Sequence, residues 1–452
     1  MNTKLLSHKT LNLNQIFSLF IKIFLLLLFL FARTFTGINI FGFRLGEYLI
    51  GGSLVLLILH VLLIPLFKRK YILDDKNLNI VISILILSFF AFLVINNNDF
   101  LNEFIYKTSS YIWSIGAVSV GYIYLSYFKF RIYRFDIVLT LLSLFVIYLF
   151  STRGISENNQ NILLNFTDKF EYPKGSDLLL VFIFVFYIYA VKSDYSKASF
   201  INLCFMTSIY VPLFLVKSRS GFISLIIFLL ILLPKYVKYF KKFDRYILLT
   251  ILISLILLLI STSWVVSRDI SIDEEIEEEL KYAITSRYQT INDNVYEREV
   301  LKLKLFYFRD GRIFSADGNL NWRFQIWQDI FRDMGYSRLF IMGYGFDDII
   351  PAMDSDQRYG QDKQNINVHN YFVHIFSRGG AIHLSLILMM YYYIYKKFYI
   401  NNMTKDYFLI TLPLIFNSLF DPSMENAHYP IIFYILLGMA LNKSIMTKWE
   451  KQ

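Results

Sequence analysis

Long apolar runs, separated by short polar segments, occupy most of this chain of 452 residues. A helix needs roughly 20 mostly apolar residues to cross the hydrocarbon core of a bilayer, and runs that approach this length recur throughout the sequence. Apolar residues make up 56% of the chain and charged residues 18%, against about 45–50% and 25% in ordinary soluble domains. This composition excludes a water-soluble multidomain enzyme, a disordered chain and a nucleic-acid-binding protein.

The apolar runs predict an all-α integral membrane protein with about twelve transmembrane helices. Lysine and arginine give the orientation, because connections on the cytoplasmic side carry an excess of both. Five basic connections, at 68–70, 129–134, 192–197, 235–245 and 396–397, fall on one side with both termini, so we expect both termini in the cytoplasm. The predicted spans lie near 15–32, 48–67, 78–95, 110–128, 136–150, 178–191, 200–216, 222–239, 247–265, 380–396, 406–420 and 429–446.

The longest polar segment, 266–368, is expected on the periplasmic face between spans nine and ten. It carries 13 Lys and Arg against 19 Asp and Glu, so the positive excess of the chain lies in the short connections. The sequence therefore divides into three parts: spans one to nine in 1–265, the periplasmic loop in 266–368, and spans ten to twelve in 369–452.

Two stretches predict that the periplasmic loop is folded and partly helical. The acidic run 273–280 is typical of the start of an amphipathic helix, although a solvated helix face is its simplest role. In 322–331 apolar residues recur at helical spacing, and Gly335 is suited to end that helix. Gly343 and Gly345 then predict a turn.

One outer turn departs from the charge pattern. Lys217-Ser218-Arg219-Ser220-Gly221 separates two apolar runs and holds two cations and no acid. Cations and hydroxyls at the membrane surface suit an anionic ligand such as phosphate, and arginine suits multidentate recognition of its oxygens. Contact with lipid headgroups is the alternative role for both cations.

A second polar segment, 368–380, leads from the loop into span ten. If it is helical, His369 and His374 lie about 140° apart around the helix axis, which does not suit a shared metal ion. A structural role is one alternative for each histidine, and a general base near pH 7 is the other. Asn370 either orients His369 or begins the helix.

Three sets of residues, taken in order along the chain, resemble the O-antigen ligase/O-antigen polymerase superfamily of bacterial envelope glycan assembly. The large outer loop between the first and third sets also matches, and the resemblance covers roughly 200–400. The sets are Ser218-Arg219-Ser220-Gly221 at the start of a span, Arg323 and Trp327 followed by Gly343-x-Gly345, and His369-Asn370 followed by Gly380.

The resemblance implies metal-independent glycosyl transfer at the periplasmic face of the inner membrane, with no cofactor. The implied donor is an undecaprenyl-diphosphate-linked glycan, and the acceptor is another glycan or lipid A-core. Membrane lipids surround the protein, and a chain-length regulator and a flippase of the same pathway are the implied protein partners. No nucleic acid is expected.

A sugar on a diphosphate already has a good leaving group, so catalysis requires stabilisation of the diphosphate charge and deprotonation of an acceptor hydroxyl. On this basis Arg219 and Arg323 are expected to bind the diphosphate, and His369 is expected to act as the base. The expected substrate-binding residues are Lys217, Ser218, Ser220, Asn370, Trp327 and Arg378.

Several activities are compatible with these residues. A polymerase that joins repeat units is favoured over a ligase or a protein O-oligosaccharyltransferase, because polymerases are numerous and divergent. A glycosyltransferase with a carboxylate base in the first outer loop is disfavoured, because that loop offers only Glu47. A flippase would place charge near mid-membrane, where the candidates are Lys22 and His60, or would use the outer cations Arg33 and Arg44.

Overall fold

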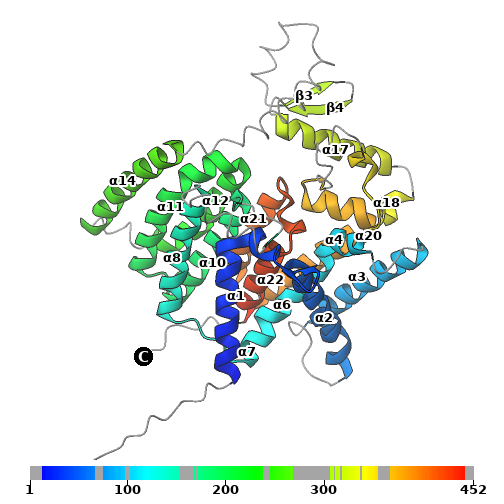
Figure 1. Cartoon of the computed structure of the whole chain (residues 1–452), viewed down its shortest axis with the longest axis horizontal. Coiled ribbons are helices and arrows are strands. Elements are labelled where there is room, and N and C mark those ends of the chain that lie inside the picture. Colours follow the sequence, from blue (N-terminus) through cyan, green and yellow to red (C-terminus); the bar gives the residue numbers. More distant parts are fainter. Residues whose placement is uncertain are drawn as a thin grey trace, which may run out of the picture.

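The computed structural model describes residues 13–66, 75–96, 102–152, 167, 172–237, 245–267, 306–309, 311–315, 318–335, 338–354 and 367–442. Helices make up nearly all of this part of the chain (Figure 1). The predicted spans coincide with helices. Eleven of them are α1 (Leu13–Thr36), α2 (Leu45–Leu66), α3 (Lys76–Ile95), α8 (Arg134–Ser151), α10 (Gly175–Lys192), α11 (Lys197–Lys217), α12 (Arg219–Leu232) with the 3₁₀ turn η4 (Leu233–Tyr236), α14 (Arg245–Ser267), α20 (Tyr371–Ile400), α21 (Thr404–Ser418) and α22 (His428–Leu441).

Within the described ranges, eight helices are long and apolar enough to cross a membrane. The all-α class of the prediction is therefore confirmed, while the count of twelve spans and the orientation stay predictions. Two small antiparallel hairpins are the sheet content of these ranges, one formed by β1 (Asn39–Ile40) and β2 (Phe43–Arg44) and the other by β3 (Phe306–Arg309) and β4 (Arg312–Ser315).

The span predicted near 110–128 is an interrupted series of short helical pieces. Two glycines explain how this irregular backbone packs closely against its neighbours. A Cβ on Gly116 would lie 2.0 Å from the carbonyl oxygen of Ser53 in α2, and one on Gly121 would lie 2.2 Å from that of Ile435 in α22. The pieces are α4 (Glu103–Thr108), α5 (Ser110–Trp113), η2 (Ser114–Gly116), α6 (Ala117–Ser119), η3 (Val120–Tyr124) and α7 (Leu125–Tyr127).

Burial separates the helices at the centre of the bundle from those at its edge. The apolar window of α10 is 89% buried within the protein, whereas that of α14 is only 17% buried. In Figure 1 α10 and α22 lie inside the bundle and α14 lies on its flank. A helix that is apolar on all sides and exposed on most of them is suited to contact with lipid.

In the described part of the polar segment between α14 and α20, β3, β4 and α17 (Gly318–Met334) lie together over one end of the bundle, at the top of Figure 1. The predicted helix and its end before Gly335 are confirmed. The hairpin is an addition to the prediction, and Gly311 turns its chain with a φ of 71°. Two further pieces follow, α18 (Leu339–Met342) and the 3₁₀ turn η6 (Pro351–Met353). The acidic run 273–280 lies outside the described residues.

Candidate active site at the outer ends of the helices

The predicted phosphate-binding turn is held rigidly between α11 and α12. The Ser218 hydroxyl accepts a hydrogen bond from the amide of Gly221 at 3.0 Å and so caps α12. A Cβ on Gly175 would lie 2.3 Å from that of Ser218, so the start of α10 packs directly on the turn. The Lys217 ammonium donates to the carbonyl of Pro173 at 3.1 Å. The turn therefore borders the segment that leads into α10.

The two other predicted residues of this turn face different surroundings. Ser220 donates a hydrogen bond to the side-chain oxygen of Asn417 in α21 at 3.2 Å, which ties the turn to the end of that helix. Arg219 is exposed at the first position of α12. An exposed guanidinium at this position can reach a ligand outside the bundle.

Helix α17 fixes the segment that contains His369. The indole N–H of Trp327 donates to the carbonyl of Val368 at 2.7 Å, and the ring of Trp322 meets the imidazole of His369 edge to face at 5.1 Å. His369 has a φ of 55°, so the chain turns sharply there and α20 begins after it. His369 and His374 therefore do not lie on one continuous helix. The Asn370 side-chain oxygen caps α20 by accepting hydrogen bonds from the amides of Phe372 and Val373.

Cations from three different elements surround His369. The pKa of its imidazole is held well below the usual range, first by burial. Like charge lowers the pKa further, from the guanidinium of Arg323 on α17, the ammonium of Lys174 before α10 and the guanidinium of Arg33 in α1. The imidazole is therefore neutral near pH 7, which is the form that accepts a proton.

A buried carboxyl shares these cations. Asp421 lies between α21 and the 3₁₀ turn η7 (Pro422–Glu425), and burial raises its pKa while Arg33, Lys174 and Arg323 oppose that rise. Its Oδ1 has no hydrogen-bond partner among the residues that the structure describes. We call Arg33, Lys174, Arg323, His369 and Asp421 the outer cluster. It holds three cations and one carboxyl, and the neighbouring Asp177 carboxylate also interacts with Arg33 and Asp421.

A hydrogen-bonded pair lies next to the outer cluster. The imidazole Nε2 of His428, at the start of α22, lies 2.6 Å from the Asp177 carboxylate in the first turn of α10. The same carboxylate accepts a hydrogen bond from the backbone amide of Lys174 at 3.0 Å. The pair therefore holds the backbone that carries one of the three cations.

Arg378 belongs to a separate buried network. It is 1% exposed, and its guanidinium donates to the backbone carbonyls of Gly345 and Asp348. Glu425 of η7 lies nearby, and burial raises the pKa of its carboxyl to about 8 while Arg378 opposes the rise. The structure therefore gives Arg378 a role in holding the 343–348 loop.

A bend in α20 joins this loop to the helix. Gly380 has a φ of 63°, which interrupts the helix and leaves carbonyls of the preceding turn to other donors. The amide of Tyr344 donates to the carbonyl of Ser377 at 2.7 Å, and that of Gly345 donates to the carbonyl of Arg378 at 3.1 Å.

The close contact between this loop and α20 requires glycine at two positions. A Cβ on Gly343 would lie 2.3 Å from the carbonyl oxygen of Arg378, and one on Gly380 would lie 2.2 Å from that of Ile341. Backbone therefore packs on backbone where α18 meets α20. These glycines therefore allow the loop to pack closely against α20.

Two of the three predicted catalytic residues, Arg323 and His369, come together in the structure. Arg33 was predicted only as one of two outer cations suited to a flippase, and Lys174 and Asp421 were not among the predicted site residues. The signal for Asp421 was its position before Pro422, at the break between two apolar runs. No cluster of three or more His, Cys, Asp or Glu residues suited to a metal ion occurs in the described residues.

Residues 203–388 match a family model described as O-Antigen ligase. This segment is therefore similar to an O-antigen ligase family domain. The matched segment contains the Ser218–Gly221 turn, α17 and His369, and it confirms the resemblance to the O-antigen ligase/polymerase superfamily. Glycosyl transfer on lipid-linked glycans by a multi-pass membrane protein is the general activity that this family supports. No curated protein and no solved structure matches the chain.

The match covers less than half of the chain, and three members of the outer cluster fall outside it. Arg33 and Lys174 precede the matched segment, and Asp421 follows it. The family domain therefore supplies Arg323 and His369, and flanking helices bring the remaining charges to them.

Proposed function

We propose that the chain transfers a glycan from an undecaprenyl-diphosphate-linked saccharide to an acceptor hydroxyl at the periplasmic face of the bacterial inner membrane. The observation that carries the proposal is the outer cluster, in which three cations surround a neutral imidazole. Several cations beside a base suit a reaction that releases a diphosphate and takes up a proton.

Each cation has its own part in binding the diphosphate. Arg323 contacts it directly and Arg219 approaches from the exposed turn, while Arg33 and Lys174 add positive charge from α1 and α10. Ser218, Ser220 and Lys217 line the approach from the turn. The indole of Trp327 and the cap made by Asn370 position His369, and Arg378 supports the 343–348 loop.

The transfer step then follows from the two kinds of group. A ring nitrogen of His369 takes the proton of the acceptor hydroxyl as its oxygen forms a bond to the anomeric carbon. The bond from that carbon to the diphosphate oxygen breaks, and the electron pair leaves with undecaprenyl diphosphate, where the cations stabilise it. The step requires no cofactor or metal, because a diphosphate is a good leaving group when its charge is neutralised.

Among the activities of the superfamily we propose a polymerase that joins repeat units, with a ligase acting on lipid A-core as the second candidate. An electrophoretic glycan profile of the host strain with His369→Ala at the native locus separates them. Core that bears a single repeat unit indicates a polymerase, whereas bare core with long lipid-linked glycan indicates a ligase. A wild-type ladder from a normally expressed variant contradicts the role of His369.

The pathway context follows from the donor. A flippase has to supply the lipid-linked repeat unit at the outer face, and a chain-length regulator acts on the product. Both are proposed as partners. Both proteins should copurify with the wild-type chain from crosslinked membranes. Copurification should be lost when the helices of 1–265 are exchanged for those of an unrelated membrane protein.

A further inference from the structure

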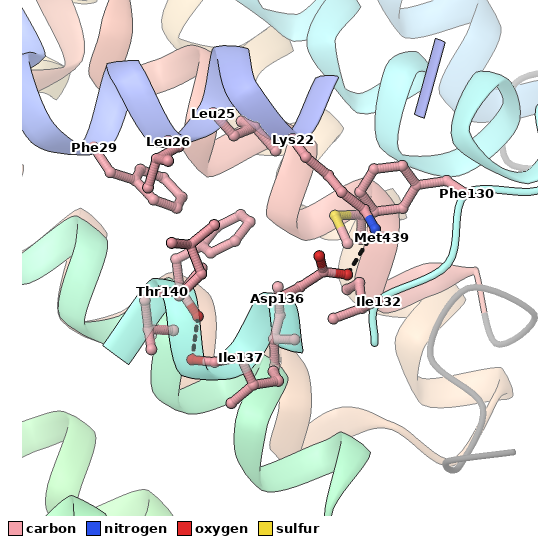
Figure 2. A pocket seen from close by; sticks show the side chains of 14 residues that line it. Lys22, Leu25, Leu26, Phe29, Phe130, Ile132, Asp136, Ile137, Thr140 and Met439 are labelled. Atoms are coloured by element: carbon pink, nitrogen blue, oxygen red, sulfur yellow. Dashed lines mark hydrogen bonds and ion pairs between the residues drawn. The ribbon is translucent and has the colours of Figure 1, made fainter. Parts of the chain in front are cut away.

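A cavity of about 70 Å³ lies between α1, α8, α10 and α22. In Figure 2, Leu25 and Phe29 of α1 face α8 across it, and the Lys22 side chain reaches over to Asp136 at one end. The rest of the lining is almost entirely apolar, with Phe184 and Ile188 contributed by α10. Apolar cavities stay dry and take up apolar groups, so this space suits a hydrocarbon chain.

The cavity lies far from the outer cluster along the same helices. Lys174 directly precedes α10, whereas Phe184 and Ile188 follow its first residue, Gly175, by nine and thirteen positions, which is roughly 14–20 Å along the axis. Lys22 precedes Arg33 in α1 by eleven positions. The cavity therefore faces the side that the basic connections assign to the cytoplasm.

The rim of the cavity alternates apolar and basic residues. The stretch 129–132 follows α7, and within it Phe130 and Ile132 line the cavity. Lys129 and Arg131, which alternate with them along the chain, are exposed, as is Arg134 at the start of α8. The stretch therefore presents its apolar side chains to the cavity and its cations to the surface.

The charged residues at the end of the cavity neutralise each other. The Lys22 ammonium lies 2.6 Å from the Asp136 carboxylate and 4.7 Å from the centre of the Tyr133 ring. Each member of the pair is about one-fifth exposed. The exposed cations beside the cavity are those of the rim.

We propose that an anionic phospholipid of the cytoplasmic leaflet binds here, with an acyl chain in the cavity and its phosphate at Lys129, Arg131 and Arg134. Basic groups beside a gap between transmembrane helices are the chemistry that recognises anionic lipid headgroups. From Lys22 to Phe29 the cavity follows α1 for roughly 10 Å, so it holds one stretch of a chain. The site is separate from the proposed glycosyl transfer.

Native mass spectrometry of the purified full chain tests this directly. Phosphatidylglycerol and phosphatidylcholine with identical acyl chains are titrated separately, and the bound fraction is measured. We expect about tenfold tighter binding of phosphatidylglycerol. Arg131→Gln should weaken it about fivefold, the effect of roughly 1 kcal/mol per cation at a membrane surface. The matched control is Lys396→Gln, which removes an exposed cation on the same predicted side and away from the cavity lining.

A second variant tests the acyl-chain site. Thr140→Phe fills the cavity and should weaken phosphatidylglycerol binding about tenfold, and Leu139→Phe replaces it if the first variant has a lower melting temperature. Equal binding of the two lipids, or equal losses from Arg131→Gln and Lys396→Gln, overturns the proposal. Displacement of phosphatidylglycerol by an equimolar amount of undecaprenyl phosphate also overturns it, because the site then belongs to the carrier lipid.

Discussion

Helix α1 carries a cation towards each of its ends, and the two have different surroundings. Lys22 is matched by Asp136 at 2.6 Å, which forms what we call the inner pair. Arg33 instead shares its surroundings with the cations Lys174 and Arg323. Both cations belong to a largely apolar helix, so helix composition alone does not distinguish them. The number of neighbouring charges does, because Lys22 pairs with a single carboxylate, whereas Arg33 interacts with two further cations and with the carboxyls of Asp177 and Asp421.

The two regions should therefore respond in opposite ways to the loss of a charge. Removal of one member of a buried pair leaves the other uncompensated and costs stability. Removal of one of several like charges relieves repulsion and costs little stability, but it weakens the binding of an anionic group. The predictions below test this contrast.

The largest effect is expected at the base of the outer cluster. His369→Gln keeps a polar side chain but removes the proton acceptor, so turnover should fall about 10²–10⁴-fold. Turnover is measured with purified, reconstituted protein and a lipid-linked saccharide donor, alongside the melting temperature. A variant that melts like the wild type and retains more than one-tenth of its turnover would remove His369 from the proposed mechanism.

At Arg323 the geometry of the charge should matter as well as its sign. Arg323→Lys keeps the charge but loses the bidentate fork that matches phosphate oxygens, and we expect a loss of about 10–100-fold in turnover. Arg323→Gln removes the charge and should cost about 10²–10³-fold. Both variants should melt within a few degrees of the wild type, because two like charges remain. Near-full turnover by Arg323→Lys would count against direct contact with the diphosphate.

At the inner pair the effect should appear in stability. Lys22→Met leaves Asp136 without its cation, and we expect a loss of about 2 kcal/mol, less than the 3–5 kcal/mol of a fully buried pair because each side chain is one-fifth exposed. The double variant with Asp136→Leu should regain most of this loss. Chemical unfolding in detergent measures both. Equal losses from the single and double variants would show that packing, and not charge, sets the stability there.

The sequence predicts the helices well because long apolar runs need no knowledge of tertiary contacts. The end of α17 before Gly335 and the turn at Gly343 and Gly345 follow from local chemistry in the same way. The interrupted span near 110–128 was predicted as a single helix, since its course depends on glycines that pack against α2 and α22.

Assembly of the site depends on contacts that the sequence does not display. Lys174 and Asp421 are separated by most of the chain, and their shared surroundings appear only when α10 and α21 are packed together. Arg378 carries the same charge as Arg323, yet backbone carbonyls of the 343–348 loop bind it. Residue type suggests candidates for a site, and the folded arrangement separates binding groups from supporting ones.

The smallest expected effect is a change in pH dependence. The cations of the outer cluster lower the pKa of His369, so kcat/KM should remain high to a pH below the ordinary range of a histidine. Lys174→Gln removes one cation, which raises that pKa and moves the acidic limb of the profile to higher pH. The movement should be small, because Lys174 is exposed and its charge is screened. Lys396→Gln serves as the control and should leave the limb in place. An acidic limb that stays fixed or moves to lower pH in Lys174→Gln would show that Lys174 does not act on the titrating group. The contrast between the outer cluster and the inner pair would then rest on Arg33 and Arg323 alone.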